Sequence, residues 1–257
     1  MFGCLTGITT VLFGFGGGFI TVPIVYAVVL RPTGGEAMHV AVATSTAVMI
    51  LNATVATAGQ ARAGRLRRGY LWPLVAFVGV GSVLGAFAGL YASDLILRSL
   101  FAAYLALTII DSLVRRGFLR ASNSVEPRPL GRAISTAGGV GVGAVASFLG
   151  VGGSVMTVPL LRRRGLPMSD AVALANPLTV PVAVVGTVVY ACSASGASIT
   201  GIWHAGYVDL GAVVALLAGS LSTIALVRRF SGRIPDRAHA AAYIGLLGAA
   251  LAATVLV

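Results

Sequence analysis

The chain has 257 residues, of which 57% are hydrophobic and only 10% are charged, and its mean hydropathy is +0.96. A soluble domain carries about 25% charged residues, so this composition excludes an ordinary soluble fold. The formal net charge of +11 comes from 18 basic residues, all of them arginine. They cluster between apolar runs, which is typical of membrane-protein loops and speaks against a nucleic-acid-binding surface.

Long runs without Asp, Glu, Lys or Arg follow one another along the chain, and a membrane span needs about 20 mostly apolar residues. The pattern predicts an all-α integral membrane protein in two halves, 1–114 and 132–257, joined by a cytoplasmic linker at 115–131. Each half is predicted to contain one glycine-interrupted segment and three plain helices. In chain order these are 1–30, 37–60, 70–93 and about 97–114, then about 133–161, 169–192, 207–227 and 238–257.

An internal repeat relates the two halves. The sequence Phe13-Gly-Phe-Gly-Gly-Gly-Phe-Ile-Thr-Val-Pro23 matches Leu149-Gly-Val-Gly-Gly-Ser-Val-Met-Thr-Val-Pro159, with six identities within ten residues. Fainter matches follow in the same order, including Gly69-Tyr70 with Gly206-Tyr207. Both glycine-interrupted segments are therefore expected to have the same structure.

The arginines indicate how these interrupted segments cross the membrane. If both segments spanned once, the arginines would divide nine against nine between the two sides. If each segment is a hairpin that returns to its starting side, the loops 62–68, 115–132, 162–164 and 228–237 share one side, and the division is sixteen against two. The second division fits the positive-inside rule, so these four loops are predicted to be cytoplasmic.

The hairpins also decide the relation between the halves. A hairpin plus three spans gives an odd number of crossings, so the two halves face opposite ways. The sequence thus predicts two inverted repeats, an arrangement common in secondary transporters. Both termini, and the uncharged stretch 192–206, are expected on the outer side of the membrane.

The two glycine clusters are the first candidate for a binding site. Irregular backbone at membrane depth is tolerated only inside protein or beside a water-filled cavity. The helix that restarts after each cluster begins with free N–H groups, which carry about half a positive charge. These ends can hold an anion without a buried cation. The alternative is that the glycines only permit close helix packing. The candidate residues are Gly14, Gly16, Gly17, Gly18, Thr21 and Pro23, with Gly150, Gly152, Gly153, Ser154, Thr157 and Pro159.

Polar side chains within the second helix of each half extend this candidate site. The first half offers Thr44, Ser45 and Asn52, and the second offers Asn176 and Pro177, with Thr46 and Thr179 nearby. They could line a solute path, and Asn176-Pro177 could bend the helix and free a carbonyl group. Interhelical hydrogen bonds are an equally good explanation for each residue taken alone.

No catalytic or metal-binding pattern accompanies these features. Neither HExxH nor GxSxG occurs, and the glycine clusters lack the lysine of a nucleotide-binding loop. Cys4 and Cys192 are far apart in sequence and form no CxxC motif, so neither a disulfide framework nor a zinc site is expected. The sequence indicates no catalytic residue, no metal and no cofactor.

The paired motifs 14–23 and 150–159, together with Ala41-Val-Ala-Thr-Ser45, resemble the sulfite exporter TauE/SafE family over nearly the whole chain. The resemblance implies a bacterial plasma-membrane permease for sulfite, organosulfonates or related sulfur-containing anions. The chain departs from symmetry in one respect, since Asn176-Pro177 stands where the first half has Thr44-Ser45.

The leading hypothesis is therefore a membrane transporter, of exporter or permease type, whose partners are a small anion and the lipid bilayer. An anion channel is the first alternative, because inverted repeats occur in channels too. A membrane-embedded enzyme lacks any visible nucleophile or metal set, and a scaffold subunit would have no obvious use for an inverted repeat.

Overall fold

The computed structural model describes residues 1–33, 36–114, 130–193, 203–227 and 235–256. Most of the predicted linker 115–131, residues 194–202 of the predicted outer loop and residues 228–234 lie outside the described part. The first half contains α1(Phe2–Phe13), α2(Gly18–Thr33), α3(Ala37–Arg62), α4(Arg68–Leu71), α5(Leu74–Tyr91) and α6(Asp94–Val114). The second half contains η2(Ile134–Gly138), α7(Gly139–Leu149), α8(Ser154–Arg163), α9(Met168–Cys192), β1(His204–Ala205), β2(Val208–Asp209), α10(Leu210–Val227) and α11(Asp236–Leu256).

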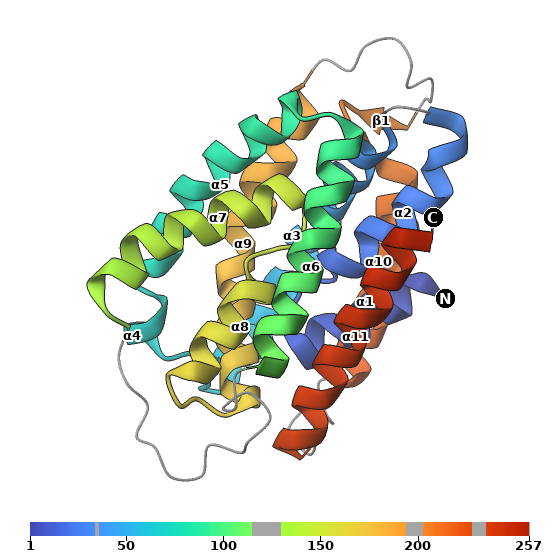
Figure 1. Cartoon of the computed structure of the whole chain (residues 1–257). Coiled ribbons are helices and arrows are strands. Elements are labelled where there is room, and N and C mark those ends of the chain that lie inside the picture. The colour runs from blue at the N-terminus through green and yellow to red at the C-terminus, as the bar shows by residue number, and fades with distance from the viewer. Residues whose placement is uncertain (34–35, 115–129, 194–202, 228–234, 257) are drawn as a thin grey trace.

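The predicted helical membrane architecture is confirmed. Six helices of the described chain are long and apolar enough to cross a membrane, three in each half. The two glycine-interrupted segments form the shorter pairs α1–α2 and η2–α7–α8, each broken at its glycine cluster. Figure 1 shows α7 rising to its break and α8 turning back toward the end of the molecule where α4 lies. This course agrees with the predicted hairpin.

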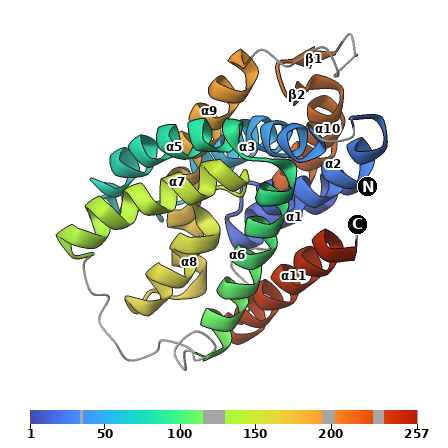
Figure 2. The same ribbon diagram turned by 45° about the horizontal axis from the view of Figure 1, so that its top comes forward.

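The two halves pack across each other rather than side by side. The first arm of each broken pair lies against a long helix of the other half, α1 on α10 and α7 on α5. At the centre, α3 of the first half packs on α9 of the second, and residues 37–46 and 171–176 are buried throughout. Figure 2 shows α5 and α7 running side by side while α11 lies at the far side, next to α6. The reciprocal pairing is consistent with an inverted repeat.

Small residues permit these crossings. A Cβ atom on Gly81 or Gly85 of α5 would collide with the backbone carbonyls of Val140 or Ala144 in α7. On the other side of the molecule, Gly3 and Gly7 of α1 meet the α10 backbone in the same way. Glycines four residues apart bring helix backbones close together in the bilayer, so GxxxG-type contacts join each first arm to the opposite half.

Ion pairs gather the arginine-rich loops at one end of the molecule. Arg67, after α3, pairs with Asp170 of α9 at 3.0 Å. Arg162 of α8 pairs with Asp236 at the start of α11 at 2.8 Å, and Arg163 pairs with Asp111 near the end of α6. These contacts gather several segments at one arginine-rich end of the molecule. They are the described parts of the loops at 62–68, 162–164 and 235–237, and the end of α6, which leads into 115–129. By the positive-inside rule, this end faces the cytoplasm.

A carboxylate supports the start of the central helix in each half. The Met38 N–H of α3 donates to Asp94 Oδ1 at 2.8 Å, and the Met168 N–H of α9 donates to Asp236 Oδ1 at 2.7 Å. Each aspartate belongs to the last long helix of the same half. Because a helix start exposes unpaired N–H groups and carries partial positive charge, the two carboxylates fix equivalent helix ends on opposite sides of the membrane.

The helix contact between α5 and α7 generates a matched test. Gly143 of α7 faces the Val78 carbonyl without room for a Cβ atom, whereas Gly141 of the same helix is exposed and has open space. We expect Gly143→Leu to lower stability by about 1–3 kcal/mol or more through overpacking, and Gly141→Leu to change it little. Thermal unfolding of the two purified variants in detergent measures the difference, and equal unfolding temperatures would contradict the proposed contact.

Candidate functional site

Both helix breaks use the left-handed backbone conformation. The φ angles of Gly14, Gly16 and Gly17 are 73°, 62° and 87°, and those of Gly150 and Gly152 are 66° and 70°. Residues with a side chain avoid this region, at a cost of about 1–2 kcal/mol each. Backbone shape therefore favours glycine at these five positions. Close packing is the separate reason for Gly81, Gly85 and Gly143, and it adds to the backbone requirement at Gly14 and Gly150.

The two breaks meet at the centre of the protein. The Ser45 hydroxyl of α3 lies 3.0 Å from the Gly18 carbonyl oxygen and 2.7 Å from that of Gly150, so one donor is shared between the two halves. The side chains of Met49 and Thr179 lie between Gly16 and Gly152. Two clusters that are 136 residues apart in sequence, Gly14 with Gly150, thus form one structural unit with α3 and α9.

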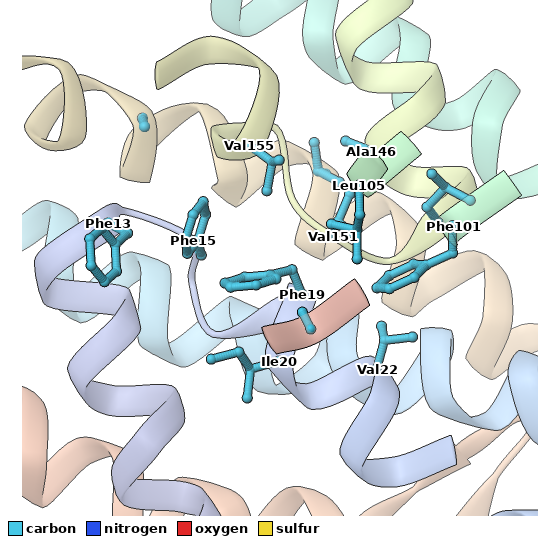
Figure 3. Close-up of a cluster of buried hydrophobic side chains, with 14 of the residues drawn as sticks. Phe13, Phe15, Phe19, Ile20, Val22, Phe101, Leu105, Ala146, Val151 and Val155 are labelled. Carbon is cyan, nitrogen blue, oxygen red and sulfur yellow. The ribbon is translucent and has the colours of Figure 1, made fainter. Parts of the chain in front are cut away.

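Each break also packs against the central helix of the other half. A Cβ atom on Gly14 would lie 2.9 Å from the Val172 carbonyl oxygen of α9, and one on Gly150 would lie 3.1 Å from the Val42 carbonyl oxygen of α3. Figure 3 shows the phenyl rings of Phe15 and Phe19 from the first break facing Val151 and Val155 of the second. The Phe15 and Phe19 ring centroids are 4.2 Å apart. This side of the breaks is an apolar wall.

Several of the predicted site residues stabilise the structure locally. Thr44 Oγ1 accepts a hydrogen bond from the Asp209 N–H of β2 at 3.1 Å, and Thr21 donates to Gly17 O within its own helix at 3.0 Å. Asn52 donates to Gly16 O at 3.4 Å and accepts from Ser220 of α10 at 2.7 Å. For Thr44 and Asn52, the structure contains the hydrogen bonds to other elements that the sequence left open as an alternative, and Thr21 bonds locally.

Three other predicted residues are buried without a hydrogen-bond partner among the described residues. They are Ser154 and Thr157, in the first turn of α8, and Asn176 of α9, whose Nδ2 and Oδ1 are both unpaired. No side chain caps the start of α8 at Gly153, so the helix end keeps the unpaired N–H groups of any helix start. The predicted residues Pro23 and Pro159 each line a groove on the side of their broken helix pair.

The α9 helix continues through Asn176-Pro177. It is helical from Met168 to Cys192, with Pro177 and Pro181 inside it, so no unwound turn occurs there. Proline has no N–H to offer the carbonyl four residues earlier, and the carbonyl of Ala173 therefore lacks its helical donor. The motif weakens the ladder of backbone hydrogen bonds without breaking the helix.

A cavity of about 380 Å³ lies between α1, α3, α9 and α10 near the arginine-rich end, and no glycine of the breaks is among its described lining residues. Arg62 and Arg65 lie near its mouth, and Asn176 and Val11 line its inner part. Neither arginine forms an ion pair with a described residue, in contrast to Arg67, Arg162 and Arg163. The described residues that line it are Val11, Val55, Ala56, Gly59, Gln60, Arg62, Ala63, Arg65, Asn176 and Ile224, and none of these carries a carboxylate.

The opposite side of the breaks is closely packed. A Cβ atom on Gly186 of α9 would lie 2.8 Å from Thr46 Cγ2 of α3 and 3.5 Å from Ser147 Oγ of α7. Farther along α9, the fully buried Tyr190 fills the space beside Gly89 of α5. The described structure is therefore open toward the arginine-rich end and closed on the other side.

Sequence reasoning missed several residues of this region. Arg62 and Arg65 were assigned only to a cytoplasmic loop, and Met49 and Gln60 carried no signal. The apolar Met49 gives no hint of its position between the breaks. A count of helical turns from Asn52 to Arg62 could have placed Arg62 on the cavity mouth, because it is the last residue of α3 and Arg65 follows three residues later.

Two broken helices from different halves that meet at mid-protein, beside a cavity, are an arrangement common in helical membrane transporters. The family model of the sulfite exporter TauE/SafE family matches residues 1–254, and the chain belongs to this family. It is also 25% identical over 236 residues to a "Probable membrane transporter protein" from Haemophilus influenzae, covering 91% of this chain and 88% of that protein. No solved structure matches the chain.

Membership in a family of membrane transporters makes this chain a multi-pass plasma-membrane transporter and not an enzyme. The predicted family, fold class and location are confirmed. The site residues remain a prediction that the following variants test.

The second break offers two adjacent glycines with different constraints. Gly152 has a φ angle of 70°, and a Cβ atom added to it would lie 2.8 Å from Thr179 Cγ2. Gly153 has a φ angle of −67°, and a Cβ atom added to it would have no contact under 3.4 Å. We expect Gly152→Ala to reduce transport strongly and to cost about 1–2 kcal/mol, and Gly153→Ala to be tolerated. Flux and thermal stability of both variants in proteoliposomes check this, and equal behaviour would argue against the left-handed break.

The shared hydroxyl generates a second test. Ser45→Ala leaves the carbonyls of Gly18 and Gly150 without this donor, which costs about 1–3 kcal/mol for buried groups. Ser82→Ala serves as the control, because that buried hydroxyl bonds only to Val78 O of its own helix, at 2.7 Å. Thermal unfolding should show a clearly larger loss for Ser45→Ala, and a loss no larger than that of Ser82→Ala would count against the bridge.

Proposed function

We propose that the protein carries a small sulfur-containing anion, sulfite or an organosulfonate, across the plasma membrane, and that the anion binds beside the two helix breaks. The observation that carries this proposal is the meeting of the breaks at Ser45, near a cavity lined by two arginines that form no ion pair with a described residue. The name of the family supplies the substrate class.

Positive potential along the cavity supports an anionic substrate. Arg62 and Arg65 stand near its mouth without carboxylate partners, and charges of one sign in a low-dielectric cleft raise the local concentration of the opposite ion. Deeper in the protein, the helix that begins at Ser154 adds the partial positive charge of a helix start. An anion could thus move from full charges near water to backbone dipoles without needing a buried cation.

The closed side favours a carrier over a channel. A channel needs a continuous path, whereas the packing of Thr46, Ser147 and Gly186 closes the side opposite the cavity. Opening that side while closing the cavity would expose the breaks to the exterior, as inverted repeats permit. Because the cavity opens at the arginine-rich, cytoplasmic end, the described state is suited to loading from the cytoplasm, as an exporter requires.

Transport assays on inside-out vesicles test this function. We expect saturable uptake of labelled sulfite or a short alkanesulfonate, with counterflow. The double variant Arg62→Gln/Arg65→Gln should lose about tenfold in uptake at low ionic strength, and the loss should shrink as salt rises, because steering by exposed charges is screened.

Arg132→Gln is the control, since this exposed arginine does not line the cavity. It should keep uptake near that of the unmodified protein at every salt concentration. The absence of saturable flux for sulfite, sulfonates and sulfate alike would reject the proposed substrate class. Flux without saturation or counterflow would indicate a channel.

A further inference from the structure

Asn176 presents an unusual energetic problem. The residue has no exposed surface, and neither its amide nitrogen nor its amide oxygen has a hydrogen-bond partner among the described residues. More than 90% of buried polar groups in proteins are hydrogen-bonded, and each unsatisfied group costs about 1–3 kcal/mol. The cost is explained if the amide serves a ligand that supplies partners to both atoms.

The surroundings of Asn176 show where such a ligand would come from. Asn176 lines the cavity together with the apolar side chains of Val11, Val55 and Ile224. From Val55 to Arg62, the α3 wall of the cavity rises by seven residues, or about 10 Å along the helix. A cavity of about 380 Å³ lies at the small end of the range for small-molecule pockets.

We propose that Asn176 is the specificity-determining residue of this cytoplasmic loading site, and that it selects oxyanions that also carry a hydrogen-bond donor, such as a hydroxyalkanesulfonate. This inference rests on the proposed function. The amide N–H donates to an anionic oxygen, while the amide oxygen accepts from the hydroxyl group of the same ligand. An alkanesulfonate without a donor satisfies only the nitrogen and leaves the amide oxygen facing an anion.

The chemistry of the amide explains why asparagine fits this position. An aspartate would repel the anion, and a cationic side chain would bind it tightly and slow its release. The amide is neutral and offers both a donor and an acceptor. Selection then arises because a site with buried polar groups rejects the analogue that leaves one of them unpaired.

Two ligands of equal charge and nearly equal size test the proposal. Ethanesulfonate and 2-hydroxyethanesulfonate differ by one hydroxyl group, and each is used to inhibit uptake of labelled methanesulfonate by the full-length protein in inside-out vesicles. We expect the hydroxylated ligand to inhibit at about tenfold lower concentration, equivalent to one hydrogen bond of about 1.4 kcal/mol. Asn176→Ala should abolish this preference, because it removes both amide atoms and demands no extra space.

Asn176→Asp provides the second variant. It keeps the shape of the side chain but replaces the donor by a negative charge, so both sulfonates should inhibit far more weakly. Gln60→Ala, on the same cavity near its mouth, should retain the preference for the hydroxylated ligand. Thermal unfolding confirms that each variant is folded.

The outcomes separate this inference from the proposed function. Equal inhibition by the two sulfonates in the unmodified protein, or an unchanged preference in Asn176→Ala, overturns selection by Asn176 and leaves sulfonate transport intact. No uptake or inhibition by any sulfonate or by sulfite overturns the proposed function itself.

Discussion

The structure depends on one requirement, that backbone polar groups exposed by the helix breaks find partners within the protein. Lipid offers no hydrogen bonds, and an unsatisfied group there costs several kcal/mol. The two breaks meet this requirement jointly, because the Ser45 hydroxyl serves carbonyls from both of them. The halves are therefore docked at the place where each is most irregular, and the polar centre of the molecule coincides with the contact between them.

Glycine serves two separate physical purposes around this centre. In the breaks, Gly14 and Gly150 hold left-handed backbone that other residues avoid. In the helices, Gly85 and Gly143 have ordinary helical backbone and instead allow α5 and α7 to touch. The second set positions the first, because each broken segment reaches the centre only when its first arm packs tightly on the opposite half. A rigid scaffold of close helix contacts thus carries a short irregular region.

The sequence predicted the spans and the breaks because both are local: run length identifies a span, and glycine clusters interrupt a helix. It also predicted that arginine loops share one end, which the pairing of Arg163 with Asp111 supports. It could not separate Thr44 and Asn52, which bond to β2 and α10, from Asn176, which has no partner. That distinction depends on contacts between residues more than 150 positions apart for Thr44 and Asn52, and such contacts leave no periodic trace in a single sequence.

The two halves share a backbone plan but differ in the polar side chains placed on it. Asp94 and Asp236 hold equivalent helix starts at nearly equal distances, yet Asp236 is also paired with Arg162, whereas Asp94 lies 3.5 Å from His39. Among the described residues, Arg62 and Arg65 line a cavity on the arginine-rich side of the centre. If the repeats exchanged conformations, the same backbone positions would open outward without the positive mouth. An anion would then meet attraction on the cytoplasmic side and little on the other, so capture would be favoured inside and release outside.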